Sequence, residues 1–155
     1  MAKYKQRISD RILKRKVLGK GAVLIEGPKW CGKTTTAKQL AKSVLDLGDS
    51  SVLKQSAQLI ELSPKTLLEG KTPRLIDEWQ ALPLIWDSIR SEVDKRGEPS
   101  QFILTGSSVL PEADETIHSG TGRFAYIKMR PMSLYESGES NGTVSLTDLF
   151  EGKPF

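Results

Sequence analysis

The sequence has one cysteine, one histidine and no long apolar run. The single cysteine, Cys31, excludes an internal disulfide framework and fits a reducing compartment such as the cytoplasm. The single histidine, His118, lacks the Cys or His partners of a zinc site, so we expect a surface loop residue. Apolar runs such as 22–25 and 102–104 are too short to span a bilayer, and no apolar signal-peptide region follows the basic N-terminus. We therefore expect a cytoplasmic protein without a membrane segment.

Charge is present in ordinary amount but is unevenly distributed. Of 155 residues, 37% are hydrophobic and 27% are charged, which is typical of one globular domain with a core. Segment 1–20 carries eight cations against Asp10 alone, about +7, whereas the rest of the chain sums to about −3. Such a basic segment is able to bind nucleic acid or another anionic partner. The alternative is a solvated basic helix at the domain edge, which the lack of an aromatic platform favours.

Short apolar segments alternate with amphipathic ones along the chain. Strands are predicted at 22–26, 74–77, 101–106 and 124–129. Helices are predicted at 4–18, from Gly32 to Leu45 with a stop at Gly48, within 64–71, and at 82–96. Residues 51–60 are ambiguous, because SVLKQ at their start is compatible with a strand. The alternation predicts an α/β fold with a mostly parallel sheet and helices on both faces.

The segment GPKWCGKT fits the phosphate-binding pattern G-x-x-x-x-G-K-[ST] in full. It directly follows a predicted strand and opens a predicted helix, the context in which backbone N–H groups and a helix N-terminus face a phosphate. Lys33 is expected to reach the β- and γ-phosphates, and the Thr34 hydroxyl to coordinate Mg²⁺. The predicted nucleotide-binding residues are Gly27, Pro28, Lys29, Trp30, Cys31, Gly32, Lys33, Thr34 and Thr35.

Two side chains in this segment have more than one interpretation. Cys31 is either a redox-sensitive thiol, whose thiolate a helix N-terminus would favour, or a spacer that contributes only its N–H group. Trp30 either stacks on a base or covers the loop from outside. We favour the spacer and the outside position.

An acidic pair, Asp77 and Glu78, ends the predicted strand at 74–77. In a P-loop ATPase the aspartate orders Mg²⁺, and the glutamate orients and deprotonates the attacking water. The alternative is a pair of surface acids that cap the next helix. Glu78 favours hydrolysis over the transfer of phosphate to a substrate hydroxyl, which is the reaction of a small-molecule kinase. We therefore expect Asp77 to share the metal with Thr34 and Glu78 to be catalytic.

Further candidates for phosphate contacts lie at the third strand and beyond it. Thr105, Ser107 or Ser108 would hydrogen-bond the γ-phosphate or the water if this strand lies beside the other two; the alternative is a set of turn residues. Arg123 and Arg130 are candidate arginine fingers, acting from their own chain or from a neighbouring copy in a homo-oligomer. The alternative for both arginines is a solvated or ion-paired side chain.

The identity of the base is predicted from what is missing. GTPases recognise guanine through an Asn-Lys-x-Asp motif, and the only asparagine in this chain is Asn141, within SNGT. We therefore expect ATP, with Mg²⁺, as the ligand.

Taken together, these segments resemble the prokaryotic AAA-type ATPases that carry a C-terminal domain of unknown function. The matching stretches are VLIEGPKWCGKTTTA at 23–37, PRLIDEWQ at 73–80, PLIWDSIRSEVDKRG at 83–97, QFILTGSS at 101–108 and HSGTGRFAYIKMRPMSLYESGES at 118–140. The resemblance implies a P-loop NTPase three-layer sandwich with an additional catalytic glutamate and the sheet order 5-1-4-3-2. It also implies that Arg123 lies where such ATPases often place a finger-like arginine.

The resemblance also sets expectations for the organisation of the chain. We expect a basic N-terminal helix at 1–20, an ATPase core at 21–135, and at 136–155 a tail or the start of a lid or second domain. Because family members are longer, we expect an N-terminal part of a longer ATPase that binds ATP and hydrolyses it with Mg²⁺. The alternative is a module without catalysis, in which ATP switches binding to nucleic acid or to a protein partner.

Overall fold

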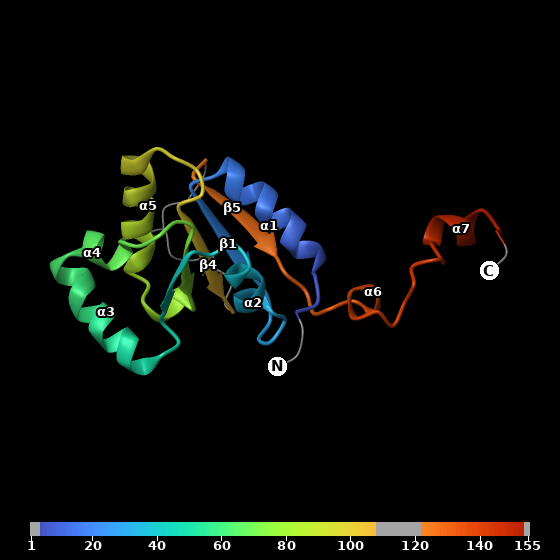
Figure 1. Cartoon of the computed structure of the whole chain (residues 1–155), viewed down its shortest axis with the longest axis horizontal. Helices are drawn as coiled ribbons and strands as arrows, with labels where there is room; N and C mark the ends of the chain where they lie inside the picture. The colour runs from blue at the N-terminus through green and yellow to red at the C-terminus, as the bar shows by residue number, and fades with distance from the viewer. Residues whose placement is uncertain (1–3, 108–121, 154–155) are drawn as a thin grey trace.

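The sheet at the centre of the protein has five strands that are paired in parallel. The computed structural model describes residues 4–107 and 122–153 (Figure 1). The strands are β1 (Ala22–Glu26), β2 (Ser43–Asp46), β3 (Arg74–Asp77), β4 (Phe102–Gly106) and β5 (Phe124–Lys128). Their order, β2-β3-β4-β1-β5, confirms the predicted α/β class and the order 5-1-4-3-2.

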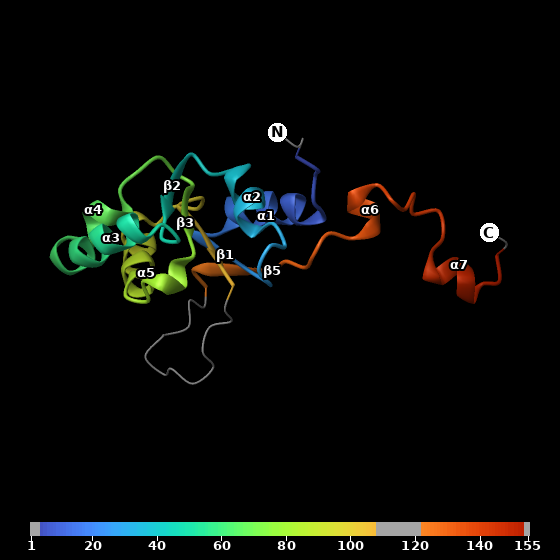
Figure 2. The same cartoon turned by 90° about the horizontal axis from the view of Figure 1, so that it is seen from below.

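Helices cover both faces of the sheet and complete three layers (Figures 1 and 2). One face carries α1 (Ile8–Gly19) and α2 (Lys33–Lys38), and the other carries α3 (Ser50–Leu62), α4 (Pro64–Leu68) and α5 (Ile85–Arg96). Along β1, Leu24 belongs to the core under α3–α5, whereas Val23 and Ile25 belong to the core under α1 and α2. A strand that is buried on both faces needs the continuous apolar run that the sequence has here.

An aromatic cluster fills the core between the sheet and α5. The Trp86 ring stacks on Phe124 with centroids 4.5 Å apart, and it lies 5.1 Å from the ring of Trp79. Burying one such side chain contributes about 1.5–3 kcal/mol to stability. Trp79 opens the short 3₁₀ helix η1 (Trp79–Ala81) directly after Glu78. The cluster therefore also fixes the backbone at the end of β3.

Residues 43–46 form β2, so the prediction that the second helix continues to Leu45 was wrong. Helix α2 ends at Lys38. Val44 and Leu45 fit the apolar spacing of a helix, but they also suit a short strand because β-branched and aliphatic residues pack well on a pleated surface. Pairing with β3 places Leu45 beside Ile76 and leaves only 8% of Leu45 exposed.

Residues 50–62 form helix α3, so the strand considered for SVLKQ is also absent. The Asp49 carboxylate accepts hydrogen bonds from the backbone N–H groups of Ser51 and Val52, at 2.8 and 3.2 Å. An N-cap of this kind contributes about 1 kcal/mol to a helix. The helix then buries Ser56 and Ile60 against the core.

After β5 the chain leaves the sheet. Helix α6 (Leu134–Ser137) lies near the start of α1, and α7 (Leu146–Phe150) extends away from the three layers (Figures 1 and 2). The expected division between residues 135 and 136 falls within α6 and stays a prediction. None of the helices in the described part of the chain is long and apolar enough to cross a membrane.

Candidate functional site

The carboxyl ends of β1, β3 and β4 lie at one edge of the sheet, because the strands are parallel neighbours. The phosphate-loop segment follows β1, Asp77 ends β3, and Thr105 lies near the end of β4. Ile25 pairs with Thr105 across the β1–β4 ladder. In open α/β sheets, ligands bind at this edge. The fold therefore brings together the three segments that the sequence singled out.

The loop at 27–34 depends on glycine at two positions. Gly27 has φ 155° and Gly32 has φ 96°. A Cβ atom at position 27 would lie 2.2 Å from the backbone oxygen of Met129, so a side chain there would push the loop off the end of β5. Trp30 has φ 63° and is 99% exposed, which places its ring outside the loop as expected.

The Lys33 side chain is hydrogen-bonded to the backbone of the loop. Its Nζ atom donates hydrogen bonds to the backbone oxygens of Gly27 and Pro28, at 2.9 and 2.8 Å. A cavity of about 530 Å³ opens over the loop. Its lining is formed by Lys29, Trp30, Gly32, Lys33, Thr34, Thr35 and Glu78. The cavity thus joins the predicted phosphate-binding residues to the predicted catalytic glutamate.

Asp77 lies beside the first turn of α2, as expected for a shared metal site. Its Oδ1 atom accepts a hydrogen bond from Thr34 Oγ1 at 2.9 Å and another from Thr105 Oγ1. Hydroxyl and carboxylate oxygens are the ligands that Mg²⁺ prefers, usually together with phosphate oxygens of a substrate. The residues present therefore fit Mg²⁺ held jointly with a nucleotide. Within the described ranges, no cluster of three or more His, Cys, Asp or Glu residues could hold a metal without it.

Thr105 has a different environment from the one predicted. Its side chain is completely buried and donates to Asp77. This hydrogen bond orients the Asp77 carboxylate, while the hydroxyl of Thr105 does not line the cavity over the loop. Ser107, directly after β4, is partly exposed but does not line this cavity either, so its contact with the γ-phosphate stays a prediction. Ser108 and His118 lie outside the described residues.

Glu78 lines the cavity from the end of β3 and has a left-handed backbone, with φ 53°. Its Oε2 atom accepts a hydrogen bond from Gln80 Nε2. The same amide nitrogen lies 3.4 Å from Ser107 Oγ. Sequence reasoning missed Gln80, although it stands in the RLIDEWQ stretch two residues after Glu78. The only available signal was that a polar residue interrupts an otherwise aromatic and apolar turn.

Arg123 lies at the amino ends of the strands, the end of the sheet opposite the loop. It directly precedes β5, whose first residue pairs with Ala22 at the start of β1, whereas the loop follows the end of β1. The five residues of β1 span about 16 Å. Arg123 instead pairs with Asp94 of α5, and this hydrogen bond lowers the pKa of Asp94. The placement excludes a finger role from the same chain, so only a role in a neighbouring copy stays a proposal.

Arg130, the second finger candidate, lies on the loop side of the sheet, just after β5. Its side chain is exposed, and its backbone oxygen accepts a hydrogen bond from Arg7 Nη2 at 2.9 Å. Arg7 Nη1 also donates to the backbone oxygen of Cys31 at 2.7 Å. Cys31 itself is buried, with Sγ 3.8 Å from the oxygen of Met129. Burial of this thiol supports the spacer interpretation.

Arg7 forms a buried ion pair that the sequence did not reveal. Its Nε atom lies 3.0 Å from Oε1 of Glu136, and the two side chains are 5% and 7% exposed. Burial alone would raise the pKa of Glu136, but backbone N–H groups of Ser133 and Ile8 and the side chains of Arg7 and Ser133 lower it to about 2. The pair therefore fastens the N-terminal segment, the phosphate loop and α6 to one another.

A second cavity, of about 420 Å³, adjoins the outer side of the loop. It lies between the N-terminal segment with Tyr4 and Lys5, the first turns of α2 with Thr35, and the residues after β5, Pro131 and Met132. It shares Trp30, Gly32 and Thr35 with the lining of the cavity over the loop.

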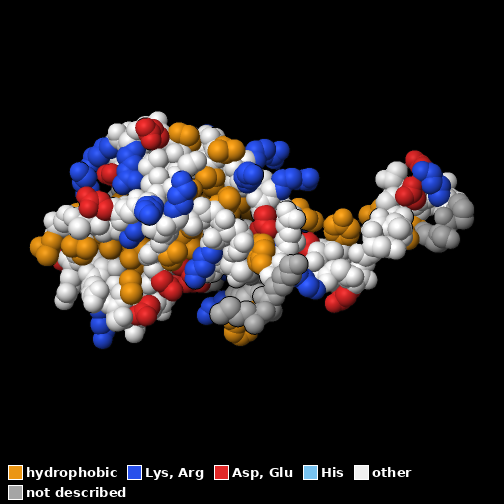
Figure 3. Space-filling model, in the orientation of Figure 1, with side chains coloured by type: hydrophobic (Ala, Val, Ile, Leu, Met, Phe, Trp, Pro, Cys, Tyr) orange, Lys and Arg blue, Asp and Glu red, His pale blue; other side chains and the backbone are white. Residues whose placement is uncertain are grey.

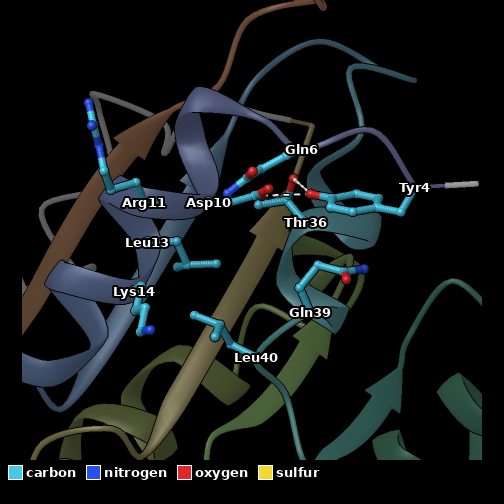
Figure 4. A pocket seen from close by; sticks show the side chains of 9 residues that line it. All are labelled: Tyr4, Gln6, Asp10, Arg11, Leu13, Lys14, Thr36, Gln39 and Leu40. Carbon is cyan, nitrogen blue, oxygen red and sulfur yellow. Dashed lines mark hydrogen bonds between the residues drawn. The ribbon is translucent and has the colours of Figure 1, made fainter. Parts of the chain in front are cut away.

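Tyr4 separates this cavity from a third one, of about 510 Å³, between α1 and α2 (Figure 4). The Tyr4 hydroxyl donates to Asp10 Oδ1 at 2.6 Å and lies 3.3 Å from Thr36 Oγ1. Burial and the hydrogen bond with Asp10 raise the pKa of Tyr4 to about 12. Leu13 and Leu40 form the apolar floor between the helices (Figure 4). Tyr4 thus ties the N-terminal segment to α2.

Comparisons with known proteins identify a family and several similar chains. A family model described as an AAA domain matches residues 19–138. Uncharacterized proteins of Mycobacterium bovis and of Mycobacterium tuberculosis are each 27% identical over 120 residues, which cover 76% of this chain. The chain spans only 27% of the length of either relative. The structure of PCH-2 from C. elegans aligns with a TM-score of 0.44 at 16% identity, covering 81% of this chain and 42% of that one.

The family match covers the sheet, the loop at 27–34, the acidic pair and α6. It leaves out residues 1–18, which include nearly all of α1, and the residues after 138. The chain therefore belongs to the AAA domain family, and its core is an AAA-type P-loop core with nucleotide-binding, ATPase-like character.

Proposed function

We propose that the chain binds ATP together with Mg²⁺ and hydrolyses it. The observation that carries this proposal is the cavity over the loop, where Lys33, Thr34 and Glu78 line one space and Asp77 lies in hydrogen-bond contact with Thr34. Phosphate binding needs Lys33, and metal binding needs Thr34 and Asp77. Activation of the attacking water needs Glu78.

Binding of the phosphates requires Lys33 to exchange partners. Its ammonium group now donates to two loop oxygens, and the same group would turn to the β- and γ-phosphates. The backbone N–H groups of the loop and of the first turn of α2 would hold the remaining oxygens. Thr34 and Asp77 would hold Mg²⁺, which when bound neutralises charge on the β- and γ-phosphates.

Hydrolysis requires a base beside the γ-phosphate, and Glu78 is the carboxylate that lines the cavity. In the step that we propose, Glu78 accepts a proton from water as the water oxygen attacks the γ-phosphorus. The bond from this phosphorus to the bridging oxygen breaks, and ADP and inorganic phosphate form. Ser107 would hydrogen-bond the γ-phosphate or the water.

The adenosine is assigned to the cavity on the outer side of the loop. Thr35 lines both this cavity and the cavity over the loop, where the phosphates would bind. Met132 and Pro131 would supply apolar contacts for a base. Adenine is preferred over guanine because the chain has no Asn-Lys-x-Asp motif.

Two substitutions with matched controls test the proposal. Lys33→Ala should abolish ATP binding measured by calorimetry, whereas Lys38→Ala, on the exposed side of the same helix, should not. Glu78→Gln should keep binding and lower phosphate release by about 100-fold or more. Glu69→Gln, an exposed acid on the other side of the molecule, is the control. Unchanged turnover in Glu78→Gln would remove Glu78 from the role of base.

The rival reactions give different products in the same assay. A small-molecule kinase would form ADP without free phosphate, and only when an acceptor is added. A binding module without catalysis would bind ATP and form no ADP. Dependence of the specific activity on protein concentration would indicate that a second copy completes the site, as a role of Arg123 in trans requires.

A second candidate function, binding of nucleic acid, is favoured by one exposed stripe of α1. Arg11, Lys14 and Arg15 are exposed at helical spacing and form no ion pair within the described residues. Lys and Arg side chains gather over α1 in Figure 3. Replacing all three by Gln should weaken binding to DNA. The slope of the logarithm of the binding constant against the logarithm of the salt concentration should become shallower by about 0.9 for each lost phosphate contact. Lys54→Gln with Lys65→Gln, on the opposite layer, is the control; equal loss there would contradict the assignment.

A further inference from the structure

The amide of Gln80 lies directly behind the Glu78 carboxylate. Its nitrogen donates to Glu78 Oε2 and lies within 3.4 Å of Ser107 Oγ. Glu78 Oε1 accepts no hydrogen bond from the described residues, and Glu78 lines the cavity over the loop. One carboxylate oxygen is therefore held by Gln80, and the other is left for a ligand in the cavity.

The orientation of this amide is set by Glu78. The other end of the amide, Gln80 Oε1, is buried and has no hydrogen-bond partner among the described residues. Turning the amide over would bring Oε1 against the carboxylate, and two acceptors would then repel each other. Leaving Gln80 Oε1 buried without a partner is unfavourable. The hydrogen bond to Glu78 therefore stabilises this orientation of the amide by more than the unpaired oxygen costs.

The end of β4 leaves Gln80 little room to move. A Cβ atom at Gly106 would lie 2.6 Å from Gln80 Oε1 and 2.9 Å from Trp79 Nε1. Trp79 in turn is anchored in the aromatic cluster with Trp86. The amide is thus held between a strand end and a buried ring, on a backbone that the core fixes.

We infer that Gln80 is a positioning residue that fixes the Glu78 carboxylate toward the phosphate cavity and links it to Ser107. The inference rests on the proposed hydrolysis, because the purpose of the contact is to orient the base. A base that is oriented by a third group is a recurring arrangement in active sites. Ser107 at the end of β4 would then contact the γ-phosphate. Its hydroxyl oxygen and the Glu78 carboxylate would both accept hydrogen bonds from the Gln80 amide.

The test compares Gln80→Met, which keeps the length of the side chain and removes its donor, with Gln58→Met on the exposed side of α3. Gln80→Met should lower kcat for ATP hydrolysis by about 10- to 100-fold, as expected for a misplaced catalytic group. KM and the affinity for ATP should stay unchanged, since no group that touches the nucleotide is lost. A general loss of structure would change both, so the split between kcat and KM separates positioning from stability.

A spectroscopic measurement tests the contact without turnover. The carbon-13 resonance of the Glu78 carboxylate, at constant neutral pH and without nucleotide, should move in Gln80→Met and stay in Gln58→Met. A wild-type kcat in Gln80→Met, or an unmoved resonance, would overturn the inference. A wild-type chain that binds ATP and releases no phosphate would instead contradict the proposed hydrolysis, so the two failures are distinguishable.

Discussion

Replacing Glu136 by glutamine removes one charge from the buried pair with Arg7 and leaves the size of the side chain unchanged. Glu136 accepts hydrogen bonds from Arg7 Nε, from the N–H groups of Ile8 and Ser133, and from Ser133 Oγ. Glutamine has one acceptor oxygen in place of two, and its amide hydrogens would face donors. We therefore expect Glu136→Gln to loosen α6 from the start of α1.

The size of the effect follows from the pKa of Glu136. A pKa lowered from 4.5 to about 2 corresponds to about 3.5 kcal/mol at most, since a pKa change of one corresponds to about 1.4 kcal/mol. The loss should be smaller than this limit, because glutamine keeps one acceptor oxygen and the exposed N–H groups of Ile8 and Ser133 can bind water instead; we expect about 1–2 kcal/mol in the free energy of unfolding. Arg7 keeps its bonds to the oxygens of Cys31 and Arg130, which limits the damage.

The sign of the pH dependence is fixed by the same shift. Because the pKa of Glu136 is lower in the folded state, its stabilising contribution is complete above about pH 4.5 and is lost as the pH falls toward 2. Protonated Glu136 resembles glutamine in charge. The difference between wild type and Glu136→Gln should therefore be constant near neutral pH and narrow by about 1 kcal/mol, half of it or more, between about pH 5 and 3.5.

Urea unfolding followed by circular dichroism measures the difference, and hydrogen exchange of residues 134–138 reports on α6 itself. Glu139→Gln is the matched control, because Glu139 is an exposed acid three residues farther along the chain. Equal free energies of unfolding and equal exchange at neutral pH would refute the reasoning. So would a difference between wild type and variant that persists unchanged into acid.

Three further predictions concern other parts of the molecule. Gly27→Ala should lose ATP binding and destabilise the fold by about 1–3 kcal/mol, since its Cβ would meet the oxygen of Met129; wild-type affinity in calorimetry would contradict this. Asp49→Ala should lower the free energy of unfolding by about 1 kcal/mol through loss of the α3 cap, which urea titration checks against Asp87→Ala. Arg123→Gln should leave ATP turnover unchanged in dilute protein. A loss of turnover in dilute protein would contradict the position of Arg123 at the end of the sheet opposite the loop.

The sequence predicted the class of fold and most of the strands, because buried parallel strands are continuous apolar runs. It failed where one pattern fits two structures. The residues of β2 match a helical spacing, and only their pairing with β3 makes them a strand. The start of α3 was ambiguous in the sequence, and the Asp49 cap makes it a helix. Both cases depend on interactions that a local pattern does not contain.

The candidate site was predicted to a similar extent. Lys33, Asp77 and Glu78 were predicted from motifs that follow predicted strands, and the structure brings their segments to one end of the sheet, while their roles stay predictions. For Arg123 the sequence left two possibilities open, a finger role within its own chain or in a neighbouring copy; its position argues against the first, because the end of the sheet at which a residue lies depends on strand direction. Arg7 was missed because its partners lie far along the chain, 24 residues away at Cys31, 123 at Arg130 and 129 at Glu136.

The exposed ring of Trp30 gives the loop an optical signal of its own. The other two tryptophans, Trp79 and Trp86, are 3% and 1% exposed, whereas Trp30 is 99% exposed. A collisional quencher such as acrylamide therefore reaches Trp30 and is kept from the buried pair. The quenchable part of the emission belongs to the loop, so any nucleotide or partner that covers it becomes visible in the unlabelled wild-type chain.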